Sequence, residues 1–271
     1  MPRPGHMPSR GSHSLIQAGN GPWRSTMTWC LGYPEQAVRR SQEALALARE
    51  LAHPLSLTFT RHGAAWLHHL RREASAVQSY AEALLTLATA QEFPAFVGYG
   101  TCWRGWVVAM QGHGEVGLAQ IQQGLAAVLA TGAIASRPQS LILLAEAAGH
   151  VGQVEEELRL LTEALAAFEA SGQGDKLTEV HRLQGELLLR QPAPDAAQAE
   201  ACFQQALAIA RRQQAKSWEL RAATSLSRLW QQQGKRAEAH ELLAPIYGWF
   251  TEGFDTADLQ DAKALLEELA G

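Results

Sequence analysis

The chain has 271 residues, 46% of them hydrophobic, and a formal net charge of −4. This hydrophobic fraction is too high for a chain that is disordered throughout, and the lack of excess basic charge argues against binding of nucleic acid. The sequence is rich in Ala, Leu, Gln, Glu and Arg and poor in Val, Ile and Tyr, which predicts an all-α protein.

Residues 1–21 are basic and lack an apolar core, so we expect a disordered leader and no secretory signal. From there on, helix-forming segments alternate with short breaks. Prolines 34, 54, 94 and 138 stand where a helix would begin, and glycines 32, 112, 152 and 234 where one would end. One domain over 22–271 is expected, with helix pairs near 22–51, 55–90, 94–131, 137–171, 175–213 and 216–250, and a capping helix at 256–269.

The second helix of each pair repeats one motif. "EALALARE" at 43–50 aligns with "EALLTLAT" at 82–89, "GLAAVLAT" at 124–131, "EALAAFEA" at 163–170 and "QALAIARR" at 205–212. Five copies at a period near 40 residues predict a solenoid, in which each unit packs only on its neighbours.

Small residues recur at fixed places in these copies. One series lies about 19 residues before each motif, at Ser25, Ala64, Gly105, Ala145, Gly185 and Ser227. A second lies near the start of each second helix, at Ala37, Ala76, Gly117, Ala199 and Ala239, but the fourth copy has Glu157 instead. Small side chains let two helices approach closely, so each series predicts a repeated helix crossing.

Small residues at these offsets resemble the tetratricopeptide repeat, and "LILLAEAAGHVGQVEEELRLLTEALAAF" at 141–168 is the best single match. The resemblance implies an α-α superhelix of about six helix pairs. The chain from about residue 29 is also similar to the C-terminal repeat region of bacterial signalling proteins that join a nucleotide cyclase or winged-helix module to a STAND-type ATPase. "WRGWVVAMQGHGE", "HRLQGELLLRQ" and "AKSWELRAATSLSRLWQQQGKRAEAHELLAPIYGWFTEGF" carry that similarity.

The catalytic modules of those proteins do not transfer to this chain. It has no Gly-x-x-x-x-Gly-Lys-Ser/Thr phosphate loop, no Gly-x-Ser-x-Gly and no His-Glu-x-x-His motif. We therefore expect a protein that is not an enzyme and that holds no cofactor and no metal.

The individual reactive residues have structural interpretations. His62, His68 and His69 lie on one helix without a local Cys or carboxylate, so a metal site is disfavoured. Cys30, Cys102 and Cys202 are widely separated, which favours a reduced, cytoplasmic protein without disulfides. Glutamates 155, 156 and 157 open a helix and are expected to form a solvated helix start.

In tetratricopeptide arrays the leading helix of each pair lines the concave groove, and this resemblance supplies the candidate partner-binding residues. They are Arg61, His69, Trp106, Met110, Glu146, Arg182, Glu186 and Arg228. The arginines at 182, 190, 221 and 228 would either clamp carboxylates of a peptide or pair within the chain with Glu179, Glu186 and Glu219.

By this resemblance the chain would be a protein-interaction scaffold, the sensor or partner-docking arm of a bacterial signalling ATPase or regulator, with a protein or peptide in its groove. Two alternatives stay open. A small effector would bind between Trp66, Trp103 and Trp106. The interrupted first pair, with "QAGNGP" at 17–22, suggests that the chain begins inside a longer array or comes from a truncated reading frame. Either origin would leave an apolar end near Trp23, Trp29 and Leu31 for self-association. The sequence contains no run of about 20 apolar residues, so we expect no membrane span.

Overall fold

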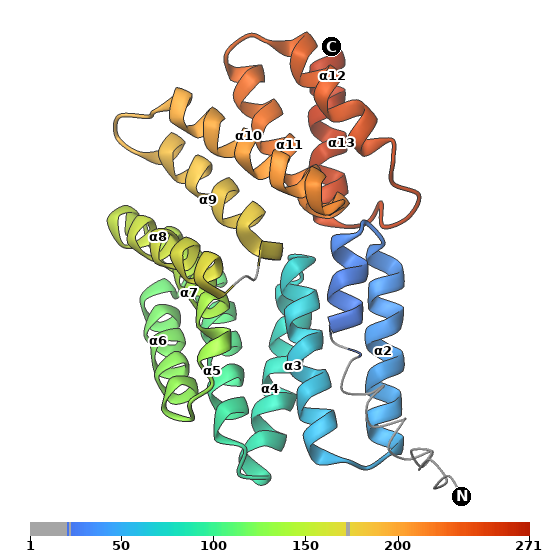
Figure 1. Ribbon diagram of the computed structural model, residues 1–271, viewed down its shortest axis with the longest axis vertical. Coiled ribbons are helices and arrows are strands. Elements are labelled where there is room, and N and C mark those ends of the chain that lie inside the picture. Colours follow the sequence, from blue (N-terminus) through green and yellow to red (C-terminus); the bar gives the residue numbers. More distant parts are fainter. Residues whose placement is uncertain (1–20, 22, 172–173) are drawn as a thin grey trace, which may run out of the picture.

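A computed structural model describes residues 21, 23–171 and 174–271, and within these residues the chain is built from helices without strands (Figure 1). After a helical stretch at 23–30 come α2 (Pro34–Glu50), α3 (Pro54–Leu70), α4 (Ala74–Ala90), α5 (Pro94–Met110), α6 (Gly114–Ala130), α7 (Arg137–His150), α8 (Val154–Ser171), α9 (Leu177–Arg190), α10 (Ala196–Gln213), α11 (Lys216–Gln232), α12 (Arg236–Tyr247) and α13 (Ala257–Ala270). Short 3₁₀ turns at Ile134–Ser136 and Gly174–Lys176 precede α7 and α9. The predicted leader lies outside the described residues apart from Gly21.

Proline and glycine set the helix ends where the sequence predicts. Prolines 34, 54, 94 and 138 occupy the first turns of α2, α3, α5 and α7, where a missing N–H removes no intrahelical hydrogen bond. Glycines 32, 112, 152 and 234 have φ between 73° and 94°, the left-handed conformation that ends a helix. Arg72 has φ 62° at the corresponding turn between α3 and α4, and this turn projects its side chain toward the superhelix interior.

Helices α5 and α6 cross closely at glycines. A Cβ atom on Gly117 would lie 2.5 Å from the carbonyl oxygen of Gly105, and one on Gly124 would lie 2.6 Å from that of Gly98. Large apolar side chains fill the wider spaces between helices, and Ile121, Leu161, Phe203 and Leu243 are fully buried. The buried apolar residues form two clusters: one runs from Trp29 to Leu187 and includes Ala210, Ala215 and Trp218, and the other runs from Ala199 to Leu269.

The array curves until its last helices contact its first (Figure 1). The ring of Trp29 packs edge-on against Trp218 of α11 at 4.8 Å between centroids, and Ser217 donates a hydrogen bond of 2.5 Å to the backbone oxygen of Trp29. The Arg221 guanidinium lies over both rings, 5.0 and 5.1 Å from their centroids. Trp29 is consequently only 2% exposed, so the prediction of an apolar end that includes it was wrong in this residue, although Trp23 and Leu31 are exposed.

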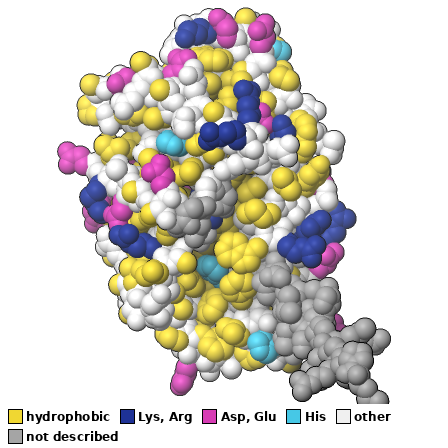
Figure 2. Space-filling model, viewed as in Figure 1, with side chains coloured by type: hydrophobic (Ala, Val, Ile, Leu, Met, Phe, Trp, Pro, Cys, Tyr) yellow, Lys and Arg dark blue, Asp and Glu magenta, His cyan; other side chains and the backbone are white. Residues whose placement is uncertain are grey.

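Helix α13 packs against α11 and α12. Its Leu259, Ala262, Leu265 and Leu269 are buried against the preceding helices, and the helix begins directly after Thr256. The face seen in Figure 2 shows acidic and basic side chains scattered among apolar ones.

Candidate functional site

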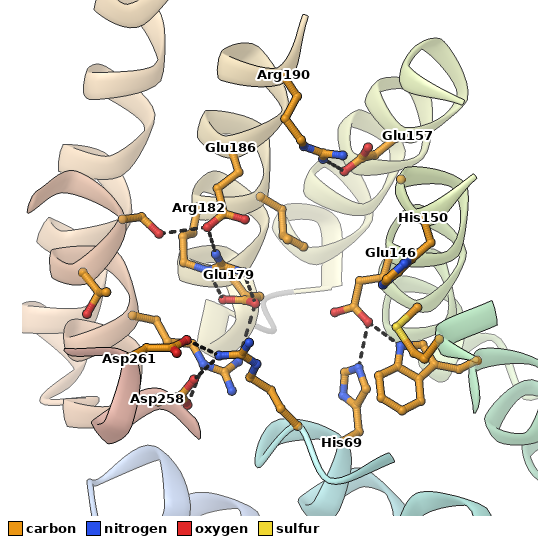
Figure 3. Close-up of a pocket in the computed structure, with 18 of the residues that line it drawn as sticks. His69, Glu146, His150, Glu157, Glu179, Arg182, Glu186, Arg190, Asp258 and Asp261 are labelled. Carbon is orange, nitrogen blue, oxygen red and sulfur yellow. Dashed lines mark hydrogen bonds and ion pairs between the residues drawn. The ribbon is translucent and has the colours of Figure 1, made fainter. Parts of the chain in front are cut away.

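The concave side of the superhelix holds a cavity of about 730 Å³. Its walls come from α3, α5, α7, α9 and α11, the leading helices of five successive pairs, and from α8 and α13 (Figure 3). The cavity is lined by six carboxylates and five arginines: Glu146, Glu157, Glu179, Glu186, Asp258 and Asp261, with Arg72, Arg182, Arg190, Arg221 and Arg228.

Glu179 lies at the centre of an ionic cluster in this cavity. Arg182 lies 2.7 Å and Arg221 3.6 Å from its Oε1, and Arg182 also pairs with Glu186. Burial on its own would raise the pKa of Glu179, but the charge and hydrogen bonds of Arg182, helped by the charge of Arg221, outweigh it and lower the pKa to about 2. This carboxylate is therefore ionised across the physiological range.

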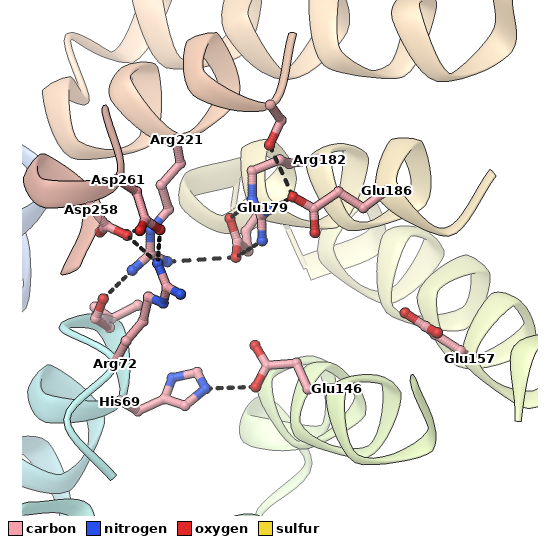
Figure 4. Close-up of polar contacts among 12 residues, drawn as sticks. His69, Arg72, Glu146, Glu157, Glu179, Arg182, Glu186, Arg221, Asp258 and Asp261 are labelled. Atoms are coloured by element: carbon pink, nitrogen blue, oxygen red, sulfur yellow. Dashed lines mark hydrogen bonds and ion pairs between the residues drawn. The ribbon is translucent and has the colours of Figure 1, made fainter. Parts of the chain in front are cut away.

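The same cluster connects the first repeats to the last helix (Figure 4). Arg72, in the turn after α3, lies 2.7 Å from Asp261 and 3.5 Å from Asp258 of α13. Arg221 of α11 lies 2.8 Å from Asp258 and donates a second hydrogen bond to the backbone oxygen of Leu70. These contacts join the turn after α3 to α11 and α13.

Of the two alternatives for the arginines, the structure shows pairing within the chain. Arg190 lies 2.6 Å from Glu157 and Arg228 3.9 Å from Asp261, in addition to the pairs of Arg182 and Arg221. The predicted partner Glu219 is not part of this network, because it pairs with Arg211 and Lys216 instead.

The wall formed by α3, α5 and α7 is aromatic and acidic. Glu146 Oε2 accepts hydrogen bonds from the indole N–H of Trp106 at 2.6 Å and from His69 Nε2 at 2.9 Å. The rings of His69 and Trp106 are in edge contact at 4.8 Å, and Met110 lines the cavity beside them. Three helices thus fix the orientation of the Glu146 carboxylate.

Glu157 occupies the position that is a small residue in the other copies. It is 2% exposed, so the expectation of a solvated helix start was wrong for this residue, while its neighbour Glu155 is exposed. One oxygen accepts the Arg190 hydrogen bond, and the other, Oε2, is buried without a hydrogen-bond partner. Gly149 makes room for the carboxylate, since a Cβ atom there would lie 2.7 Å from Oε2. Burial raises the pKa of Glu157 despite Arg190.

Seven of the eight sequence-predicted groove residues line this cavity: His69, Trp106, Met110, Glu146, Arg182, Glu186 and Arg228. Arg61 lies elsewhere, because its guanidinium donates to the backbone oxygen of Ala83 at 2.8 Å and so bridges α3 and α4. Arg72, Asp258 and Asp261 were absent from the predicted groove. The sequence offered no sign that α13 would reach the turn after α3, which depends on the curvature of the array.

The predicted tryptophan pocket for a small effector is filled by packing. Trp66 and Trp103 contact each other at 5.4 Å between centroids, and the space beside them amounts to about 10 Å³, no larger than one water. Trp103 donates to His62 Nδ1 at 3.1 Å, and burial lowers the pKa of His62 to about 4. Burial likewise raises the pKa of the Cys102 thiol to about 12, which makes it a poor nucleophile.

Among the described residues, no three His, Cys, Asp or Glu side chains are grouped as metal ligands would be. Over the same residues, no helix combines the length and the apolar character needed to cross a lipid bilayer.

No protein-family model and no curated protein matches the chain. Its fold is similar to solved structures at low identity. One is the structure of NprR in complex with its cognate peptide NprX, at 13% identity and a TM-score of 0.65, with 98% of this chain and 73% of that one covered. Another is a Rap protein complexed with competence and sporulation factor, at 11% identity and a TM-score of 0.61, with 97% and 76% covered.

A third is a STAND protein with a tetratricopeptide repeat sensor from Pyrococcus horikoshii, at 14% identity and a TM-score of 0.51. The match covers 94% of this chain but 38% of that protein. The fold is a tetratricopeptide-like solenoid. At these identities the similarity establishes the fold alone.

Proposed function

We propose that this tetratricopeptide-like chain is a non-catalytic protein-interaction module that binds an extended peptide segment of a partner in its concave cavity. The observation that carries the proposal is the cavity itself. Its volume of about 730 Å³ falls among those typical of ligand sites, and its walls offer carboxylates, guanidinium groups and the apolar surfaces of Trp106 and Met110. Fixed groups of both charges suit the amides and side chains of a peptide.

Two further points support a peptide over a small apolar effector. The tryptophan pocket that such an effector would need is closed by the packing of Trp66 on Trp103. Two proteins of similar fold were solved with a peptide or a sporulation factor bound.

The test is binding of a fluorescein-labelled pool of random octapeptides, followed by fluorescence anisotropy. Met110→Trp places a bulky ring at the cavity wall and is expected to weaken binding at least about tenfold, equivalent to about 1.4 kcal/mol. Leu158→Trp, on the exposed outer side of α8, is the matched control and should bind like the wild type. A wild type that binds no peptide, or equal binding by both variants, would overturn the proposal.

We also propose that this module is the sensor or docking arm of a bacterial signalling ATPase or regulator in the cytoplasm. Support comes from the similarity of the repeat sequences to those of such signalling proteins. It also comes from the similar fold of the STAND protein with a tetratricopeptide repeat sensor. An antibody raised against the chain, used on extracts of the producing cells, should detect a polypeptide or stable complex that also yields phosphate-loop peptides in mass spectrometry. A chain that is recovered alone would contradict this role.

Self-association through the first helix is a second candidate, because that helix has an exposed apolar stripe. Trp23 and Met27 lie four residues apart on one helical face, and Leu31 follows in the turn directly after the helix. These side chains are 54%, 39% and 45% exposed. Light scattering should show a mass that rises with concentration and that returns to one chain in Trp23→Ser/Leu31→Ser. A mass of one chain at all concentrations would exclude this role.

A further inference from the structure

The charges that line the cavity are not balanced at its α5–α7 wall. Each of the five arginines lies within 4 Å of a carboxylate on α8, α9 or α13. Among the described residues, Glu146 is the lining carboxylate that pairs with no arginine or lysine, since its partners are the Trp106 indole and the His69 imidazole. One negative charge in this wall therefore lacks a permanent positive counterpart.

An unsatisfied acceptor lies on the neighbouring helix. Glu157 is buried on α8, and its Oε2 has no hydrogen-bond donor although the residue lines the cavity. A buried carboxylate oxygen without a donor destabilises the fold, and the small residue found at this position in the other copies would avoid that cost. Gly149, one turn after Glu146 on α7, faces the Glu157 carboxylate, since a Cβ atom there would lie 2.7 Å from Oε2. The negative charges of Glu146 and Glu186 add to burial in raising the pKa of Glu157.

We infer that Glu146 and Glu157, together with the face of Trp106, form a subsite for a cationic group of the bound peptide. A primary ammonium or a guanidinium supplies the donors that Glu157 Oε2 lacks and the charge that Glu146 lacks. Trp106 and Met110 offer apolar surface for the methylene stem of such a side chain. This inference rests on the proposed peptide binding and adds the chemical class of the peptide.

Three octapeptide pools, amidated and free of Arg, His and additional Lys, provide the test. The first has an acetylated N-terminus and a central lysine. The second replaces that lysine by acetyl-lysine, which keeps the stem and removes the charge. The third carries central acetyl-lysine and a free N-terminus, so that binding to an α-amino group is distinguished from binding to a side chain.

The wild type is expected to bind the first or the third pool at least about tenfold more tightly than the second. Glu157→Gln and Glu146→Gln each remove one charge with little change in shape, and the preference should fall toward one in both. Glu156→Gln is the matched control, because this neighbour on α8 pairs with Arg159 outside the cavity. It should keep the full preference.

Equal binding of all three pools by the wild type would overturn the cationic subsite and leave peptide binding intact. A preference that persists in both Glu157→Gln and Glu146→Gln would place the cation elsewhere and would also overturn it. Binding of none of the pools and of none of the random peptides would instead overturn the proposed function. The wild-type comparison needs no variant, so the test stands even if one substitution impairs folding.

Discussion

Glu35 and Glu252 cap each other's segments across the two ends of the superhelix. Glu252 Oε1 accepts hydrogen bonds from the backbone N–H groups of Glu35 and Gln36, both at 3.0 Å. Glu35 Oε1 in turn accepts one from the N–H of Gly253 at 2.8 Å. The residue before α2, Tyr33, provides no side-chain cap, so the first turn of this helix depends on a carboxylate more than 200 residues away.

We predict that Glu252→Ala lowers the free energy of unfolding by about 1 kcal/mol, the usual contribution of a helix cap. Amide hydrogen exchange should become faster at Glu35 and Gln36, because their N–H groups lose their acceptor. Glu241→Ala, an exposed glutamate on α12, is the control and should change neither quantity. Unaltered exchange at these two amides in Glu252→Ala would contradict the capping role.

The glycines of the α5–α6 crossing provide a second prediction. Gly117→Ala would place its methyl 2.5 Å from the Gly105 carbonyl oxygen and 2.6 Å from the Ala109 nitrogen, both rigid backbone atoms. The helices must move apart, and the expected destabilisation is about 2–3 kcal/mol, measured by urea unfolding. Gly112→Asn is the control, since its position is open and Asn tolerates a left-handed φ. A stability loss below that of the control would mean that the crossing is looser than described.

Most of the fold could be predicted from local sequence patterns, but the candidate site could be predicted only in part. Proline and glycine positions determine the helix ends, and the series of small residues determines the crossings, because both act within one repeat. The contact between Trp29 and Trp218 could not be predicted, because it depends on small rotations summed over the whole array. The same curvature brings Asp258 and Asp261 to Arg72.

Glu157 shows a different limit. The sequence marked it as the exception in its series, and three adjacent glutamates at a helix start indicated a solvated segment. Gly149 decides the outcome, because the missing side chain on the facing helix gives the carboxylate a buried place. A charged residue that departs from the repeat pattern therefore indicated the candidate site. Its burial could be recognised only once Gly149 on α7 was known to face it.

Stability should depend on pH through Glu179. Its pKa in the folded chain is about 2, below the ordinary value of about 4.3, so its ion pairs stabilise the fold above that ordinary value and lose their effect as pH falls toward 2. Glu179→Gln is expected to cost about 3 kcal/mol at pH 7, because it leaves Arg182 and Arg221 without a central anion. The difference from the wild type, measured by urea unfolding, should shrink between pH 5 and pH 3. A difference that stays constant over this interval would contradict the assignment.

Glu157 should show the opposite pH dependence. Burial raises its pKa in the folded chain, so the folded form holds a proton more tightly than the unfolded form, and the stability contribution of Glu157 declines as pH rises through that raised pKa. Glu157→Ala restores a small residue and removes the unpaired Oε2, while Arg190 remains 46% exposed to water. We expect the variant to be more stable than the wild type at pH 7 by about 1 kcal/mol, with a smaller gain at pH 4, and to have lost its preference for cationic peptides. Urea unfolding at the two pH values measures the change in stability, and the acetyl-lysine comparison measures the change in peptide preference. If the variant, compared with the wild type, is less stable at pH 7 than at pH 4, then Glu157 is kept for the fold and not for a ligand.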